Sequence, residues 1–211
     1  MSGTTIQDMN QVPRAFERSL SEYGITLSPE QMKVVRGGSK RQALLKLIPP
    51  GKKQMNLVEK VYKSFHAHLE QIYNETGVLP VAGAEEVFGM LRERGMHIVL
   101  NTGFDRETTE FLLKRLKWTG SLIDGFVCSD DVRSGRPAPY MIFHAMETVG
   151  VESVHNVANV GDTALDLRAG HNAGVRWNIG VLTGAHDREV LEKEPYTHIF
   201  PSVADLLTLW A

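Results

Sequence analysis

Two aspartates four residues apart, Asp162 and Asp166, follow an apolar run that ends at Gly161. The run predicts a buried parallel strand, and ligands of open α/β sheets bind where such strands end. Carboxylates at that edge suit a hard cation, which prefers oxygen ligands and often keeps several waters. A structural role fits the spacing equally well, because Asp162 or Thr163 could cap the next helix with Asp166 in its first turn. The spacing alone leaves both interpretations open.

Two further motifs place polar side chains at predicted turns. Thr102 and Gly103 follow an apolar run at 97–100, where a hydroxyl and a closely approaching backbone N–H suit a phosphoryl oxygen. The same residues would also serve as a simple strand exit. Arg136 lies between a glycine and a proline and could make a forked contact with phosphate, or it could be a solvated loop residue.

Composition excludes several classes of protein. The chain has 211 residues and a net charge of −2, so no strong field attracts it to nucleic acid or to an anionic membrane. No apolar run approaches the roughly 18 residues that span a bilayer. The first residues lack the basic and apolar regions of a signal peptide, and the single cysteine, Cys128, cannot form an internal disulfide. We therefore expect a cytoplasmic protein in which Cys128 is a buried apolar residue.

The order of elements predicts an α/β fold with a separate helical segment. Residues 8–76 carry helical patterns only, with expected helices at about 10–23, 28–38, 39–48 and 53–74. Beyond residue 77, helices at about 83–94, 105–117, 138–148, 164–173, 187–193 and 203–210 alternate with strands at about 97–100, 125–128, 154–160, 176–182 and 197–200. Such alternation is typical of a parallel sheet with right-handed crossovers.

Four motifs in sequence order support a more specific interpretation. They are Met1-Ser2-Gly3-Thr4-Thr5, Asn101-Thr102-Gly103-Phe104, Gly135-Arg136-Pro137-Ala138-Pro139-Tyr140-Met141, and Val160-Gly161-Asp162-Thr163 with Asp166. Together they resemble the haloacid dehalogenase superfamily, and most closely its phosphonatase-like branch, which carries Gly-Arg-Pro where most members have lysine. The resemblance implies a Rossmann-like parallel-sheet core at 1–7 and 77–211 and an inserted all-helical cap at 8–76. The first, central strand of that core is missing from the sequence.

The resemblance also implies a mechanism and a set of site residues. An aspartate attacks phosphorus to form an aspartyl-phosphate, with Mg²⁺ as cofactor. Asp162 and the backbone oxygen of Ser2 would be metal ligands, and Asp166 would act through a water. Catalytic roles carry over to Thr102, Arg136 and Asp166, and Thr102, Gly103 and Arg136 would bind the phosphoryl group.

A lysine in the cap gives the phosphonatase-like branch its particular chemistry. In phosphonatase it forms a Schiff base with the aldehyde of phosphonoacetaldehyde, and Lys40 matches its Gly-x-x-Lys spacing. A lysine in the first turn of an exposed helix is also commonplace, so the substrate could be a phosphate ester instead. Arg36 and Arg41 are weaker candidates for substrate contact, and His186 is a candidate for the edge of the site.

One departure from the family pattern concerns the attacking group. The family's aspartate stands immediately before the residue that Met1 matches, so we expect residues 1–211 to be inactive if Met1 is an internal methionine of a longer protein. The alternative is a non-catalytic relative that binds a phosphorylated ligand or a partner. The expected partners are a small phosphate or phosphonate and a second copy of the chain docked through the cap, with no nucleic acid and no membrane.

Overall fold

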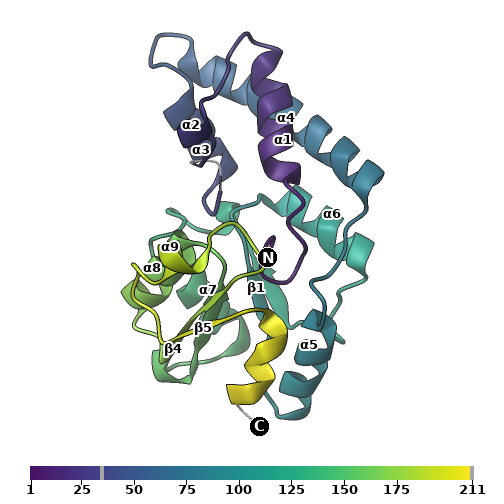
Figure 1. Ribbon diagram of the computed structural model, residues 1–211, viewed down its shortest axis with the longest axis vertical. Helices are drawn as coiled ribbons and strands as arrows, with labels where there is room; N and C mark the ends of the chain where they lie inside the picture. The colour runs from purple at the N-terminus through teal and green to yellow at the C-terminus, as the bar shows by residue number, and fades with distance from the viewer. Residues whose placement is uncertain (34–35, 210–211) are drawn as a thin grey trace.

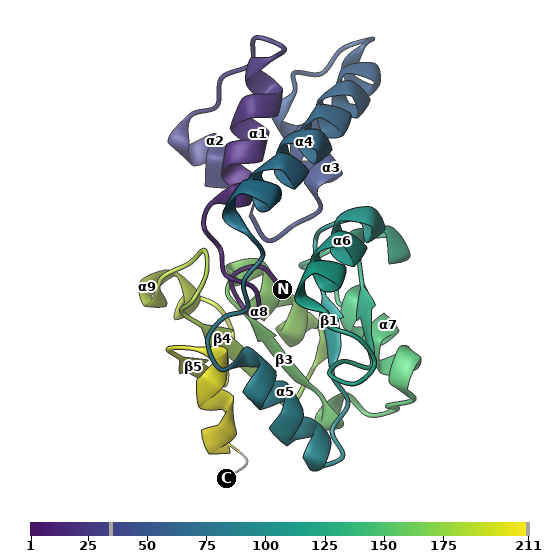
Figure 2. The ribbon, with the colours of Figure 1, turned by 90° about the vertical axis from the view of Figure 1, so that its right-hand side faces the viewer.

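The protein has a helical part and a strand-containing part, which the chain connects by two crossings (Figures 1 and 2). The computed structural model describes residues 1–33 and 36–209. The helical unit, residues 11–76, contains α1 (Gln11–Ser21), α2 (Pro29–Lys33), α3 (Lys40–Leu47) and α4 (Gln54–Thr76). No strand occurs among its described residues, which agrees with the helical expectation, while residues 34–35 of the expected second helix lie outside the description.

The helical unit is held together by one apolar face of α4. Val58, Val61, Phe65 and Leu69 recur at helical spacing and are all buried. Phe65 packs against Phe16 of α1, with ring centroids 4.5 Å apart. The same hydrophobic cluster continues into the strand-containing part, so the two parts share apolar contacts.

The strand-containing part alternates helices and strands as expected. Its order is α5 (Ala84–Glu93), β1 (Val99–Asn101), α6 (Arg106–Leu116), β2 (Gly125–Val127), α7 (Tyr140–Val149), β3 (Ala158–Gly161), α8 (Ala164–Ala173), β4 (Trp177–Val181), α9 (Arg188–Leu191) and β5 (His198–Phe200). Every strand pair is parallel. Separate buried clusters lie under α5 and under α7 with α8, so helices cover the sheet strands on more than one side.

The strands form two sheets rather than one. β1 pairs with β2, and β3, β4 and β5 pair in that order. Among the described residues no ladder of hydrogen bonds joins β1 to β3. The carboxyl ends of β1 and β3 nevertheless lead into the two loops that carry Thr102 and Asp162.

Three element predictions need correction. The strand expected at 154–160 begins at Ala158, because Val154–Asn156 form a 3-10 turn in which the Ser153 hydroxyl accepts from the His155 N–H at 3.3 Å. The last helix is a 3-10 helix, Val203–Leu209, and the expected residue 210 lies outside the description. The helix expected at 28–38 is helical over Pro29–Lys33, and residues 36–38 form bends outside any helix. No helix among the described residues is long and apolar enough to cross a membrane.

Candidate active site

A cavity of about 50 Å³ lies where the helical unit meets the loops after β1 and β3. Its lining includes every residue that the sequence pointed to as catalytic, phosphate-binding or metal-binding: Ser2, Lys40, Thr102, Gly103, Arg136, Asp162 and Asp166. Asp8, Arg36 and Phe104 also line it. Segments separated by more than a hundred residues in the sequence thus contribute to one small polar space.

Asp162 follows directly after β3 and is only 4% exposed. Its Oδ1 accepts from the Thr4 hydroxyl at 2.8 Å, and its Oδ2 accepts from the Ala185 N–H at 2.9 Å. A Cβ on Gly184 or Gly3 would lie 2.0 Å or 2.3 Å from Oδ2, so both positions require glycine. Two loops from opposite ends of the chain therefore close around one carboxylate.

Asp166 has the structural role that the sequence left open, and it also lines the cavity. The Thr163 hydroxyl caps α8 by accepting from the Asp166 N–H at 3.3 Å, while Asp166 Oδ2 accepts from the Thr163 N–H at 3.0 Å. This reciprocal pair is a capping box. The other oxygen, Oδ1, forms an ion pair with the Arg136 guanidinium. Because Thr163 caps the helix, Asp162 is left to face the cavity.

Arg136 brings a buried positive charge to the cavity. Its side chain is 9% exposed, and its Nε has no hydrogen-bond partner among the described residues. Burial lowers the pKa of Arg136 to about 10, and the nearby charge of Asp162 acts in the opposite direction. Leaving a buried N–H unpaired costs about 1–3 kcal/mol, so this geometry favours a bound anion that would accept from it.

Thr102 and Gly103 form the turn after β1. The Thr102 N–H donates to the Val127 carbonyl at 2.9 Å, which extends the pairing of β1 with β2. Its hydroxyl accepts from the Phe104 N–H at 3.2 Å, so the residue stabilises the turn as well as lining the cavity. A Cβ on Gly103 would lie 2.4 Å from the Gly38 carbonyl oxygen. Glycine here lets the helical unit approach the turn closely.

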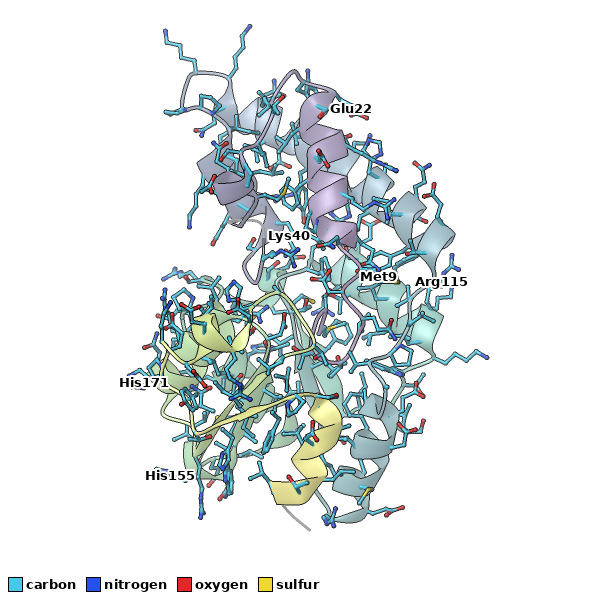
Figure 3. The ribbon with its side chains drawn as sticks, in the orientation of Figure 1. Met9, Glu22, Lys40, Arg115, His155 and His171 are labelled. Atoms are coloured by element: carbon cyan, nitrogen blue, oxygen red, sulfur yellow. The ribbon has the colours of Figure 1, made fainter. Side chains whose placement is uncertain are left out.

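Lys40 differs from the exposed first-turn lysine that its sequence context suggested. It is only 6% exposed, its Nζ donates to the Gly38 carbonyl at 3.2 Å, and it lies 5.1 Å from the centroid of the Phe104 ring. Burial lowers the pKa of Lys40 to about 7, and the positive charge of Arg136 adds to the effect. Figure 3 shows Lys40 at the junction of the two parts of the molecule. A large fraction of this amine is therefore neutral near pH 7.

Comparison with known proteins decides the family. A family model described as haloacid dehalogenase-like hydrolase matches residues 2–179. The chain belongs to this family. Over 137 residues it is 36% identical to a phosphonoacetaldehyde hydrolase of Parabacteroides distasonis, covering 65% of this chain and 51% of that protein. The chain spans about half the length of the curated relatives it matches. The resemblance to the phosphonatase-like branch is thus confirmed at the level of sequence.

Solved structures agree on the fold. A hydrolase from Pseudomonas syringae superimposes with a TM-score of 0.85 at 22% identity, over 98% of this chain and 93% of that one. A phosphonoacetaldehyde hydrolase-like protein from Oleispira antarctica gives a TM-score of 0.85 at 22% identity, over 98% and 87% of the two chains. At this identity the likeness shows the haloacid dehalogenase-like fold alone.

Other residues considered for the site fall into two groups. Arg36 lines the cavity, where its Nη1 lies 2.8 Å from Asp8 Oδ2, whereas Arg41 pairs with Glu59 on the surface at 3.2 Å. His186 lies beside the site, accepting from the Ala164 N–H at 3.0 Å. Cys128 is fully buried, as expected.

Sequence reasoning missed Thr4, Asp8 and Ala185 as partners in this site. Thr4 and Ala185 bind Asp162 across 158 and 23 residues of sequence. Asp8 binds Arg36 across 28 residues. No local pattern marks any of these pairings. The nearest signal was the position of Thr4 in the first family motif and of Ala185 in the Gly-Val-Leu-Thr-Gly-Ala-His segment at 180–186.

Proposed function

We propose that the protein acts on a small phosphonate that also carries an aldehyde, as a hydrolase of the phosphonatase type. The single observation that carries the proposal is one cavity lined by a buried guanidinium, two carboxylates and a buried lysine whose pKa is lowered to about 7. The named relatives, which are phosphonoacetaldehyde hydrolases, support the same substrate class.

Arg136, Thr102 and Gly103 would bind the phosphonate group. The unpaired Nε–H of Arg136 provides a charged donor, and charge-assisted hydrogen bonds are about twice as strong as neutral ones. The turn at Thr102 and Gly103 adds a hydroxyl and the backbone N–H of Gly103 to the lining of the same cavity. Donors that are already in place stabilise the charge spread over a transferring phosphoryl group.

We propose Mg²⁺ as the cofactor, held by Asp162, by the backbone oxygen of Ser2 and, through water, by Asp166. Among the described residues no group of three or more His, Cys, Asp or Glu side chains could hold a metal. Two buried carboxylates fit magnesium, which commonly binds one or two carboxylates together with waters and substrate oxygens. The ion would supply charge stabilisation for phosphoryl transfer.

Lys40 would act on the aldehyde. Its neutral Nζ adds to the carbonyl carbon, and loss of one water leaves an imine between the lysine and the substrate. Protonation of that imine makes it an acceptor for the electron pair released when the carbon–phosphorus bond breaks. The lowered pKa of Lys40 supports this role, because an ordinary lysine is almost entirely protonated near pH 7.

The attack on phosphorus would form an aspartyl-phosphate, and this step needs a carboxylate aimed at the substrate. The three aspartates of the cavity are already bound to protein donors: Asp162 to Thr4 and Ala185, Asp166 to Thr163 and Arg136, and Asp8 to Arg36. We therefore propose that residues 1–211 alone bind the substrate without turning it over. A non-catalytic protein that binds a phosphorylated ligand is the second candidate, favoured by the same observation.

The helical unit would act as a cap over the cavity. Support comes from Lys40 and Arg36, which the unit contributes to the lining, and from the close contact of Gly38 with Gly103. We propose core segments at 1–7 and 77–211 and a cap at 8–76. A cap-mediated homodimer and a cytoplasmic location stay predictions.

The substrate proposal can be tested by trapping the imine. The protein is incubated with phosphonoacetaldehyde and Mg²⁺, reduced with borohydride, and mapped by peptide mass spectrometry. We expect an adduct at Lys40 that retains the phosphonate group. Acetaldehyde, which has no phosphonate for Arg136 to bind, should give far less. Lys46, exposed on the same helix, provides the matched control in the variant Lys46→Met.

Each result has a defined meaning for the proposal. An adduct that has lost the phosphonate would show that residues 1–211 break the carbon–phosphorus bond, and the proposed inactivity would be wrong. Equal labelling at Lys40 and at exposed lysines, or no adduct at Lys40, would refute the substrate class. Hydrolysis of small phosphate esters without any adduct would place the protein among ordinary phosphatases.

A further inference from the structure

A second polar cluster lies outside the cavity, between the middle of α4 and the beginning of α6. Asp105 caps α6, with its Oδ1 accepting from the Thr108 N–H at 2.8 Å. Its Oδ2 faces α4, where it lies 2.6 Å from His66 Nε2 and accepts from the Tyr62 hydroxyl. One carboxylate thus joins the two parts of the molecule, and no step of the proposed reaction uses it.

We propose that Tyr62, His66 and Asp105 form a clasp that docks α4 against the loop carrying Thr102 and Gly103. Asp105 follows that loop directly and begins the next helix, so its position fixes the end of the loop. Tyr62 and His66 come from the same face of α4, one turn apart. The three residues are therefore positioning residues for the phosphate-binding loop, since none of them lines the cavity.

The position of the clasp on α4 lets it restrain rotation of the helical unit. The chain returns to the strand-containing part after α4 ends at Thr76, and His66 lies about 15 Å along the helix from that end. A contact this far from the crossing resists rotation of the helical unit about it. The loop held by the clasp also carries Phe104, the ring beside the Lys40 amine. Loosening the clasp would therefore disturb both sides of the cavity.

The clasp is sensitive to protonation. Burial lowers the pKa of His66, but the hydrogen bond and charge of Asp105 outweigh it, so the pKa is raised above 6.5. Burial raises the pKa of Asp105, but its bonds to His66, Tyr62 and Thr108 outweigh this and hold the pKa well below 3.8. The other charged groups facing His66 are Glu107, which raises its pKa, and Arg41, which lowers it.

The direction of the pH effect follows from these pKa values. The ion pair contributes fully between about pH 4, where Asp105 of the unfolded chain becomes charged, and about pH 6.5, where His66 of the unfolded chain loses its proton. The contribution is lost as the pH rises through the raised pKa of His66. The neutral imidazole can still donate from Nε2 to Asp105 while Nδ1 accepts from the Thr108 hydroxyl at 3.4 Å. Raising the pH thus weakens the clasp without removing it.

Hydrogen exchange of the Thr108 amide tests the clasp directly, because that amide donates to Asp105. The whole protein is measured from pH 5 to pH 8.5, with correction for the intrinsic pH dependence of exchange. Hydrogen bonds between charged groups are about twice as strong as neutral ones. We therefore expect the exchange protection of the Thr108 amide to fall about fivefold as His66 deprotonates. The variant His66→Gln keeps a donor but does not titrate, so its protection should be independent of pH.

His68 offers a matched control two residues away. Its Nε2 lies 2.7 Å from Glu22 Oε1, so it also pairs with a carboxylate, but both residues belong to the helical unit. The variant His68→Gln should retain the wild-type pH dependence at Thr108. Asp105→Asn keeps a good capping side chain but removes the charge, and it should abolish the pH dependence.

The proposal is overturned if His66→Gln retains the wild-type pH dependence, or if His68→Gln loses it. Should Asp105→Asn fail to fold, the two histidine variants decide the matter without it. The measurement needs no substrate and no turnover, so its outcome is separate from that of the proposed reaction.

Discussion

The buried amine of Lys40 leads to a quantitative prediction about pH. Burial lowers its pKa from 10.5 to about 7. At pH 7 about half of the Lys40 side chains should therefore carry a neutral amine, against about 0.03% for an ordinary lysine. The structure thus predicts that the neutral, reactive form of the Lys40 amine is more than about a thousandfold more populated at pH 7 than in an ordinary lysine.

Reductive methylation with formaldehyde and cyanoborohydride measures this population. The rate at Lys40 is followed by peptide mass spectrometry from pH 5.5 to pH 9.5, with the exposed Lys193 as the reference for the reagent. We expect the Lys40 rate to rise to a plateau with its midpoint near pH 7. Because the positive charge of Arg136 contributes to the lowered pKa, Arg136→Met should move the midpoint upward. A midpoint above about pH 9 in the wild-type protein would refute the reasoning.

The same lowered pKa has a consequence for stability. Between pH 7 and pH 10.5 the unfolded chain binds more protons at Lys40 than the folded chain does, so stability should rise with pH in that window. At about 1.4 kcal/mol for each pKa unit, the full rise is at most about 5 kcal/mol. Lys40→Met should remove this pH dependence and raise the unfolding free energy at pH 7. An unchanged pH profile in chemical denaturation would contradict the assignment.

Further predictions concern the metal site, the loop contact and the helical core. Asp162→Asn should weaken Mg²⁺ binding about tenfold or more in calorimetric titration, and unchanged affinity in this variant would refute the metal assignment. Asp166→Asn should weaken binding less, since Asp166 is expected to act through water. Gly103→Ala places a Cβ 2.4 Å from the Gly38 carbonyl oxygen, so it should loosen the two loops and speed hydrogen exchange around residue 103. Phe65→Ala should cost about 3–5 kcal/mol in denaturant unfolding, because the ring is fully buried.

Much of the fold could be predicted because its signals are local. The apolar positions of α4 recur with helical spacing, and the buried face has the residues expected from that spacing. The strands of the parallel sheet are apolar runs between turn residues, and each was found within a few residues of its expected place. The exception at 154–156 has a local cause as well, since the Ser153 hydroxyl stabilises a turn where the apolar pattern suggested a strand.

The environment of the site residues could not be predicted in the same way. Lys40 lies in a polar, helix-compatible stretch, yet it is buried beside residues distant in the sequence, such as Phe104, whose ring centroid lies 5.1 Å from its Nζ. His66 and His68 lie two apart on α4, so their side chains point to different sides of the helix and the spacing indicates no shared site. Nothing in the local sequence of His66 points to Asp105, which lies 39 residues away and meets His66 only when the helical unit docks.

The two interpretations of the aspartate pair turn out to be compatible for a physical reason. A helix that begins at the end of a parallel strand needs an acceptor for its first N–H groups, and Thr163 supplies it together with Asp166. Once Thr163 fills that role, Asp162 is left with one oxygen bound by Thr4 and the other by Ala185, both from distant loops. The capping box therefore fixes the backbone that aims Asp162 into the cavity. Disrupting it with Thr163→Val should move both carboxylates, so we expect this variant to lower Mg²⁺ affinity although Thr163 contributes no charge; unchanged affinity would show that Asp162 is positioned by its loops alone.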